Sequence, residues 1–348
     1  MPVQTVLIAN RGEIAVRIAQ ALAALGCRSI GVHASDDAAS LHTRKVDQAV
    51  ALPGSGPAAY LDMDAVLEIA KNNGCDSIHP GYGFLSESAD FARRCMDAGL
   101  TSIGPAPETL ELFGDKAAAR RLAVECGVPV VPGTEGATGL EEAKRFFETL
   151  PAGRGMMIKA LAGGGGRGMR YVGSPDEIEA AFERCRSEAE TSFGNPDVYV
   201  EAAVERPRHV EVQILGDGTE VIHLGERDCT LQRRHQKLVE FAPAPGLSPK
   251  MRERLCDAAL RMGRHLEYVG LGTIEFLVDG DEFFFMEANP RLQVEHTVTE
   301  MITGLDLVEL QVKVASGIGL PELGLSQSPP ARGQALQLRI NTEAMQPD

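Results

Sequence analysis

The stretch VQTVLIANRGEIAVRIAQALAALGCRSIGVH, residues 3–33, decides the fold class. Residues 3–9 form an apolar run typical of a buried parallel strand, and residues 13–25 carry apolar side chains at helical spacing before Gly26. Residues 28–33 predict a second strand. A strand, a helix and a second strand make a βαβ unit, so the sequence predicts an α/β fold that opens with a doubly wound sheet.

The same alternation continues as far as residue 103. Residues 62–73 and 89–98 have helical spacing, residues 75–79 predict a strand, and another short strand ends at Ile103. The segment GPAP at 104–107 interrupts this pattern with turn residues. We therefore expect an N-terminal Rossmann-like domain over residues 1–113.

The rest of the chain predicts a glycine-rich lobe followed by a region dominated by strands. We expect the lobe, about residues 130–200, to move as a lid. A helix is predicted at 115–126, before the lobe. Within the lobe we predict helices at 139–149 and 175–190 and strands at 156–160 and 169–172. The later strands are predicted at 198–202, 208–215, 220–224, 237–242, 271–278, 282–288 and 335–343, with helices at 248–267 and 304–317.

Composition narrows the function classes. A net charge of −15 argues against binding to nucleic acid or to anionic membranes. The seven cysteines lie far apart without a CxxC pair, which is typical of reduced thiols, and no signal peptide or membrane-spanning apolar run is visible. These features predict a cytoplasmic enzyme of 348 residues with more than one domain.

The segment EANPRLQVEH at 287–296 carries the strongest chemical signal. On an extended chain Glu287 and Asn289 share one face, and Arg291, Gln293 and Glu295 repeat the alternation. The segment thus offers oxygen ligands for a hard cation next to a guanidinium, an amide and a carboxylate. Such a set suits a phosphate-bearing metal beside a small anion.

A second carboxylate, Glu275, precedes a hairpin turn at Asp279 and Gly280. A regular two-residue loop would place Glu275 and Glu287 on opposite faces, whereas a three-residue loop or a β-bulge would place them on the same face. Two carboxylates with Asn289 form an all-oxygen set, which suits Mg²⁺ or Mn²⁺ better than Zn²⁺.

Three weaker signals have a structural reading as well as a functional one. The loop AGGGGRGMR at 162–170 follows Lys159 and predicts a phosphate cradle, or a flexible surface loop; it matches neither the P-loop nor the dinucleotide pattern. The basic residues in 233–237 predict an anion-attracting patch, or a solvated strand edge. His79, Tyr82 and Gly83 follow a strand of the first sheet, where they suit a ligand or a turn equally.

Seven motifs in order resemble the biotin carboxylase subunit or domain of biotin-dependent carboxylases, which belongs to the ATP-grasp group. They are IANRGEIAVRI at 8–18, HPGYGFLSE at 79–87, GDKAAAR at 114–120, IKALAGGGGRGMR at 158–170, RHVEVQILGD at 208–217, ERDCTLQRRHQK at 226–237 and EANPRLQVEHTVTEMITGLDLVELQ at 287–311. The resemblance implies an ATP-grasp domain over 114–320. It also implies that residues 321–348 begin a C-terminal domain that continues in the family beyond Asp348, so we expect a truncated chain.

The family's activity is the ATP-dependent carboxylation of biotin by bicarbonate through carboxyphosphate. The resemblance therefore implies that the chain binds ATP and two Mg²⁺ or Mn²⁺ ions, and that biotin is a substrate attached to a carrier. The chain lacks the Met-Lys-Met site of a biotinyl domain, so biotin must arrive on a carrier domain or protein. A carboxyltransferase partner and a homodimer are further expectations from the family.

Roles for individual residues also follow from the resemblance. ATP would contact Lys116, Lys159, Gly164, Gly165, Gly166, Met169, Glu201, Val204, His209, Gln232 and His235. The metals would be held by Glu275, Glu287 and Asn289. Bicarbonate and biotin would meet Tyr82, Lys237, Arg291, Gln293, the backbone of Val294, Glu295 and Arg339, and the catalytic groups would be Glu295 as general base with Arg291, Lys237 and Arg339. Arg339 would stabilise the biotin enolate.

Two positions depart from the family pattern, and two other functions compete. Phe241 and Gln337 stand where many members carry an acid, which affects the subtype and not the reaction class. One alternative is another ATP-grasp ligase, such as half of a carbamoyl-phosphate synthetase large subunit, which would use ammonia. The other is a nucleotide-binding fragment with little catalysis.

Overall fold

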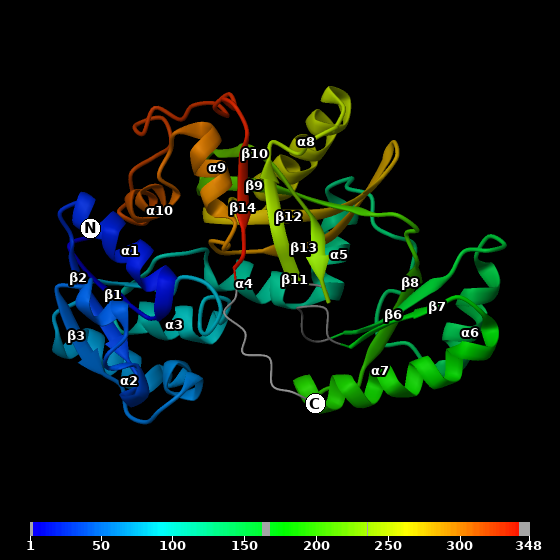
Figure 1. The fold of residues 1–348 in the computed structure, drawn as a ribbon, viewed down its shortest axis with the longest axis horizontal. Coiled ribbons are helices and arrows are strands. Elements are labelled where there is room, and N and C mark those ends of the chain that lie inside the picture. Colours follow the sequence, from blue (N-terminus) through cyan, green and yellow to red (C-terminus); the bar gives the residue numbers. More distant parts are fainter. Residues whose placement is uncertain (1–2, 162–167, 235, 341–348) are drawn as a thin grey trace.

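The structure, a computed structural model, describes residues 3–161, 168–234 and 236–340. The expected contacts of Gly164, Gly165, Gly166 and His235 with ATP lie outside these residues. The described residues form an α/β fold with three sheets, one parallel and two antiparallel (Figure 1). This arrangement confirms the predicted fold class.

The N-terminal sheet is parallel throughout and has the order β3-β2-β1-β4-β5. Along β1, Val6 and Ile8 pack with α1, whereas Leu7 and Ala9 face the core shared with α2 and α3. Helices therefore cover both faces, as in a doubly wound sheet. The elements are β1 (Thr5–Ile8), α1 (Gly12–Ala24), β2 (Arg28–His33), β3 (Gln48–Ala51), α2 (Met63–Asn72), β4 (Ser77–His79), α3 (Ala89–Asp97) and β5 (Thr101–Ser102), with 3₁₀ turns at Ser35–Asp37, Leu41–Arg44 and Pro57–Leu61.

A small lobe lies at the opposite end of the long axis from the N-terminal sheet (Figure 1). Its three-stranded antiparallel sheet has the order β7-β6-β8 and packs against α6 and α7 through a separate apolar core. The elements are α6 (Leu140–Thr149), β6 (Met156–Ala160), β7 (Met169–Val172), a 3₁₀ turn (Pro175–Glu177), α7 (Ile178–Phe193) and β8 (Val198–Ala202). Two helices, α4 (Pro107–Gly114) and α5 (Lys116–Glu125), precede it.

Between these two ends lies a six-stranded antiparallel sheet with the order β13-β12-β9-β10-β11-β14 (Figure 1). Its main core includes residues of α5 and α8, whereas α10 packs against α1 of the N-terminal sheet. The elements are β9 (Arg208–Asp217), β10 (Val221–Arg233), β11 (Gln236–Ala242), α8 (Pro249–His265), β12 (Val269–Asp279), β13 (Glu282–Asn289), α9 (His296–Thr303), α10 (Leu307–Ala315) and β14 (Ala335–Leu338).

Several predicted bounds differ from the structure. The strand expected at 220–224 continues to Arg233. Its charged residues Glu226, Arg227 and Asp228 are buried, whereas residues 230–233 are exposed, so this part lacks the regular alternation of a half-buried strand. Helices α4 and α9 were not predicted, and the helix expected at 304–317 spans only Leu307–Ala315. The final strand, expected over 335–343, is assigned over Ala335–Leu338, and residues 341–348 lie outside the described part.

The alternation predicted for 287–295 holds only as far as Asn289, where β13 ends. Residues 290–295 leave the sheet, and Glu295 immediately precedes α9. The side chains converge nevertheless, because Glu275 accepts hydrogen bonds from Asn289 and Gln293. The extended-strand argument was therefore wrong beyond Asn289, although the expected cluster forms.

The β12–β13 hairpin contains the bulge that a shared site requires. Asp279 pairs with Glu282, which leaves a two-residue loop, yet Glu275 is directly opposite Glu287. The register shifts between Glu275 and Phe276, so that Met286 is the extra residue. A bulge thus compensates for the two-residue loop, which is one of the two geometries that the sequence left open.

Within the described ranges, no helix is both long and apolar enough to cross a membrane.

Candidate active site

Lys237 of β11 is the centre of a buried charge cluster. Its Nζ lies 2.6 Å from Glu211 Oε2, 3.0 Å from Glu275 Oε1 and 2.6 Å from Glu295 Oε1. Burial lowers the pKa of Lys237, but the three carboxylates outweigh it and hold the pKa well above its usual range. The lysine therefore stays protonated at neutral pH and does not act as a base. It lies where four segments of the chain meet.

Arg227 of β10 lies beneath this cluster and is completely buried. Its Nε donates to Glu211 Oε1 at 2.5 Å, and its terminal nitrogens donate to Gln213, Thr273, Gln293 and Thr299 at 2.7 to 3.1 Å. All donors of the guanidinium are thus directed to fixed acceptors, which is the condition for keeping a charge in a dry interior. Arg227 is a rigid support for Glu211 and Gln293.

Sequence reasoning missed Arg227 and Glu211 as parts of the site. A signal existed for the second, because His209, Glu211 and Gln213 alternate with apolar residues along one strand and so share a face. Buried polar residues on a sheet face that is otherwise apolar indicate a functional interior. No local pattern distinguishes Arg227 from a surface arginine.

Glu295 is buried between three cations. Burial raises its pKa, but Lys237, Arg227 and Arg339 together lower the pKa to about 2. Arg339 NH2 donates to Glu295 Oε2 at 2.8 Å, so each carboxylate oxygen has a cationic partner. The carboxylate is therefore ionised at neutral pH, as a proton acceptor must be.

Glu275 and Glu287 face one another across the bulged hairpin, at the other side of Lys237. Burial and the charge of Glu275 raise the pKa of Glu287, whereas the pKa of Glu275 is held well below its usual range, against burial, by Lys237 and His209. Glu287 accepts no hydrogen bond from residues 3–161, 168–234 or 236–340. Two adjacent carboxylates, one without a partner, fit a hard divalent cation.

Asn289 contributes to this site differently from the expectation. Its Nδ2 donates to Glu275 Oε1 at 2.7 Å, and its Oδ1 accepts from Arg291 NH2 at 2.9 Å. It therefore joins the carboxylate pair to Arg291.

A second cationic group lies between the small lobe and the six-stranded sheet. Lys159 of β6 forms an ion pair with the buried Glu201 of β8, which also accepts from Arg120 of α5. Burial lowers the pKa of Lys116, at the start of α5, and the charge of Glu287 opposes that shift. Against burial, the charge of Glu287 acts to raise the pKa of both lysines, so they lie near the carboxylate pair, where they would neutralise phosphate groups.

The remaining residues assigned to ATP lie around this group. His209 Nε2 is 2.5 Å from Glu275 Oε2, and its Nδ1 contacts Gln232 Nε2 at 2.9 Å. Met169 pairs with Lys159 across the β6–β7 ladder, and Val204 follows the end of β8. The structure thus brings these predicted residues to one region.

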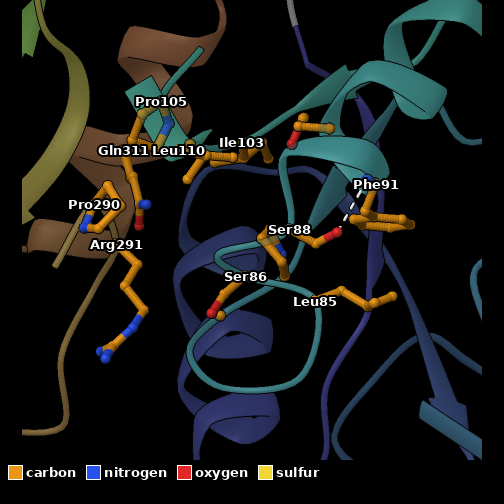
Figure 2. Close-up of a pocket in the computed structure, with 15 residues that line it drawn as sticks. Leu85, Ser86, Ser88, Phe91, Ile103, Pro105, Leu110, Pro290, Arg291 and Gln311 are labelled. Atoms are coloured by element: carbon orange, nitrogen blue, oxygen red, sulfur yellow. Dashed lines mark hydrogen bonds between the residues drawn. The ribbon is translucent and has the colours of Figure 1, made fainter. Parts of the chain in front are cut away.

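The loop at 79–88 of the N-terminal sheet reaches the same site. Glu87 pairs with Arg291 Nε, and the Tyr82 hydroxyl donates to Glu13. Burial, and after it Glu13, raises the pKa of Tyr82, so the phenol stays neutral. Figure 2 shows Arg291 and Pro290 on one side of a small cavity, opposite the loop that carries Ser86.

His79 is not at this surface. It is completely buried and burial lowers its pKa to about 3, so it is a neutral core histidine whose Nδ1 accepts from the backbone N–H of Gly81. The structure therefore places His79 at the end of β4, in the core, and not in the turn that follows.

The predicted basic patch at 233–237 divides in two. Lys237 points into the carboxylate cluster, whereas Arg234 is exposed at the β10–β11 turn. The local cluster of basic letters therefore contains one deeply buried cation and is not a continuous surface patch.

A parallel N-terminal sheet, a small antiparallel lobe and a larger antiparallel sheet that carries paired carboxylates beside buried lysines together define a protein of the ATP-grasp class. Comparison with known proteins agrees. The family model "Biotin carboxylase, N-terminal domain" matches residues 2–110, and the model "Carbamoyl-phosphate synthase L chain, ATP binding domain" matches residues 115–323.

Individual relatives specify the family further. The pyruvate carboxylase of Staphylococcus aureus is 50% identical over 350 residues, which cover 98% of this chain and 30% of the relative. The biotin carboxylase from Campylobacter jejuni superimposes with a TM-score of 0.93 at 41% identity and covers 97% of this chain and 75% of that one. The biotin carboxylase domain dimer of Hydrogenobacter thermophilus 2-oxoglutarate carboxylase, solved with MgADP, ADP and bicarbonate, has a TM-score of 0.93 at 40% identity, with 99% and 76% covered.

The chain therefore belongs to the biotin carboxylase family. It spans about 30% of the length of the curated relatives that it matches.

Proposed function

We propose that this chain catalyses the ATP-dependent carboxylation of biotin by bicarbonate, the first half-reaction of a biotin-dependent carboxylase. The observation that carries the proposal is the convergence on Lys237 of two sites. Glu275 and Glu287 lie on one side of it, and Glu295, with Arg339, lies on the other. A site for a nucleotide–metal complex thus adjoins a site for a small anion.

On the nucleotide side, Lys116, Lys159 and His209 would contact ATP, as would Glu201, Val204, Met169 and Gln232. Glu275 and Glu287 would hold Mg²⁺ or Mn²⁺, which neutralises phosphate charge when bound. The raised pKa of Glu287 supports this assignment, because a cation would relieve the repulsion between the two carboxylates.

On the anion side, Arg291 would hold bicarbonate, with Gln293 and the backbone of Val294. The guanidinium of Arg291 is already oriented by Glu87 and Asn289. Lys237 would contact the same bicarbonate. This contact would hold the bicarbonate against the terminal phosphate of ATP. These positions favour formation of carboxyphosphate.

Glu295 would remove the proton from bicarbonate. With Lys237 and Arg339 both bonded to it, the pKa of Glu295 is about 2 and the carboxylate is a weak base. When those cations turn toward substrate oxygens, the pKa rises, so the base becomes stronger when the anion is in place. Arg339 would then stabilise the negative charge that develops on the biotin ureido oxygen.

The proposal extends to organisation and partners. Residues 1–113 would form the N-terminal domain, 114–320 the ATP-grasp domain with its lid at about 130–200, and 321–348 the start of a third domain. A biotin carrier and a carboxyltransferase would be the partners, with a homodimer as the assembly. The free cysteines support a cytoplasmic location.

The decisive experiment measures ATP hydrolysis in the presence of bicarbonate, with Mg²⁺, and adds free biotin or ammonia in turn. We expect hydrolysis to need bicarbonate and to increase with biotin. Stimulation by ammonia alone would instead assign the chain to the carbamoyl-phosphate chemistry named in one of the matching family models.

Isothermal titration with MgATP tests the remaining possibility, a nucleotide-binding fragment with little catalysis. Binding without bicarbonate-dependent turnover would indicate a nucleotide-binding fragment, and no binding at all would contradict every ATP-grasp assignment.

A further inference from the structure

Glu240 of β11 is a buried carboxylate that the proposed mechanism does not use. Its side chain is completely buried, and its Oε1 accepts from Arg339 Nε at 2.6 Å. Among the residues that the structure describes, no group donates to Oε2. Arg339 is therefore the partner that compensates the charge of Glu240.

This arrangement is costly for stability. A buried carboxylate with one unpaired oxygen loses hydration that a single ion pair does not fully replace. Burial raises the pKa of Glu240, which agrees with an environment that disfavours its charge. Native proteins usually retain an unfavourable buried charge of this kind only where a function requires it.

The geometry around Arg339 shows what Glu240 does. Two carboxylates hold the guanidinium: Glu240 bonds to Nε and Glu295 bonds to NH2 at 2.8 Å. The bond from Nε fixes the plane of the guanidinium, while the side chain remains 26% exposed. The backbone N–H of Arg339 also donates to Leu238 O at 2.9 Å, so the residue is attached to β11 at two points.

The two carboxylates differ in what they do during the proposed reaction. Glu295 takes the proton of bicarbonate: the O–H bond breaks, its electron pair stays on bicarbonate, and a carboxylate oxygen of Glu295 gains the proton. The neutral acid then attracts Arg339 less strongly. Glu240 bonds to a different nitrogen of the guanidinium, so its hydrogen bond does not depend on the proton that Glu295 takes.

We propose that Glu240 is a positioning residue for Arg339, holding the guanidinium toward biotin after Glu295 has been protonated. The inference rests on the proposed function and deepens it. It assigns the two halves of the anion site to different substrates: Glu295 couples Arg339 to bicarbonate, and Glu240 orients Arg339 for the ureido group.

The test compares Glu240→Gln with a matched control in the full natural polypeptide that carries residues 1–348. Two rates are measured: bicarbonate-dependent ATP hydrolysis without biotin, and carboxylation of free biotin at varied biotin concentration. We expect Glu240→Gln to keep the first rate within about twofold, because Glu295, Lys237 and Arg291 remain, and to lower kcat/KM for biotin roughly 10- to 100-fold through loss of a charged hydrogen bond.

The control is Glu226→Gln. Glu226 is a buried glutamate of the same sheet, and it accepts from Arg252 Nε at 2.5 Å without contacting Arg339. It reports the general cost of removing a buried charge, so both rates should fall equally or not at all. Thermal unfolding of both variants shows whether the fold persists.

The outcomes separate the two proposals. Equal loss of both rates in Glu240→Gln, or an unchanged kcat/KM for biotin, would overturn the positioning role. Absence of bicarbonate-dependent hydrolysis in the unmodified protein would contradict the proposed function itself, whatever Glu240 does. A biotin-specific loss in Glu240→Gln that Glu240→Asp partly restores would support positioning, since aspartate keeps the charge.

Discussion

Glu295 lies among positive charges that determine its protonation. The fully ionised carboxylate faces Lys237 and Arg339, and its pKa is about 2. A glutamine at this position keeps the size of the side chain but accepts no proton. The residue is thus a specific test of base catalysis.

For Glu295→Gln we expect kcat for bicarbonate-dependent ATP hydrolysis to fall by about 10²- to 10⁴-fold, the usual contribution of a general base. The affinity for MgATP, measured by isothermal titration, should change little, because the nucleotide group lies on the other side of Lys237. Near-normal turnover would remove Glu295 from the role of base.

Glu287→Gln tests the carboxylate pair that Glu275 and Glu287 form. Here the pKa is raised, in contrast to the lowered pKa of Glu295. The pKa of Glu287 is raised by burial and by Glu275, so its ionised form opposes folding. That penalty is absent below the unfolded pKa of about 4.3 and appears as the pH rises toward and through the folded pKa. With a chelator at pH 7, the variant should therefore unfold at an equal or higher temperature than the unmodified protein.

The same variant should bind MgATP more weakly, because one of the two proposed metal ligands is lost. Thermal unfolding with and without Mg²⁺ and ATP measures both effects. An unchanged metal requirement would show that Glu287 is not a ligand.

At the scale of the element, α5 illustrates how the start of a helix places a lysine of the proposed nucleotide site. Asp115 caps the helix, and its carboxylate accepts from the N–H groups of Ala117 at 2.8 Å and Ala118 at 3.1 Å. Lys116, the next residue, is the first of the helix and lies near Glu287. The cap therefore fixes the backbone that carries this lysine near Glu287.

Removing the cap should affect stability more than chemistry. We expect Asp115→Ala to lower the free energy of unfolding by about 0.5–2 kcal/mol, and Asp115→Asn, which caps equally well, to change it by a few tenths. Urea unfolding measures the difference. Equal effects of the two variants would show that the cap contributes nothing here.

The bulge in β13 is a second element with a direct consequence for the site. A regular two-residue hairpin would turn Glu287 away from Glu275, and the extra residue Met286 restores their common face. Hydrophobic alternation predicted both strands but could not predict this shift, because a bulge changes the pairing partner and not the composition of the strand.

At the scale of the whole molecule, the proposed anion site is built from two regions far apart in sequence. Glu87 comes from the loop between β4 and α3 of the parallel sheet, and Arg291 follows β13, an edge strand of the six-stranded sheet. Their ion pair orients the guanidinium from the N-terminal side, and Figure 2 shows how closely Pro290 and Arg291 approach that loop.

We expect Glu87→Gln to raise the KM for bicarbonate roughly 2- to 10-fold, as suits a half-exposed ion pair, without changing the KM for ATP. The control is Glu111→Gln, which removes an exposed ion pair with Arg93 elsewhere on the surface and should leave both constants unchanged. Equal shifts of both constants in Glu87→Gln would indicate a general loss of structure instead.

The sequence by itself determined the succession of elements and the family. Periods of two and 3.6 residues, with glycine at the turns, predicted the parallel N-terminal sheet and most later strands, because apolar burial on one face imposes those periods. Ordered motifs then implied Lys237, Glu275 and Glu295 as residues of one site, but not Glu211 or Arg227. Helix α9, the long strand β10 and the departure from the sheet at Pro290 carried no such period.

Only the tertiary structure decided how the charges are paired. Arg227, Glu211 and Glu240 became parts of the site when strands from distant segments were aligned, and the hairpin bulge brought Glu287 to Glu275. The physical reason is that an ion pair depends on distance and burial in space, whereas a sequence records only neighbours along the chain. In our proposals glutamate therefore has three different roles: a base at 295, a metal ligand at 287 and a positioning residue for arginine at 240.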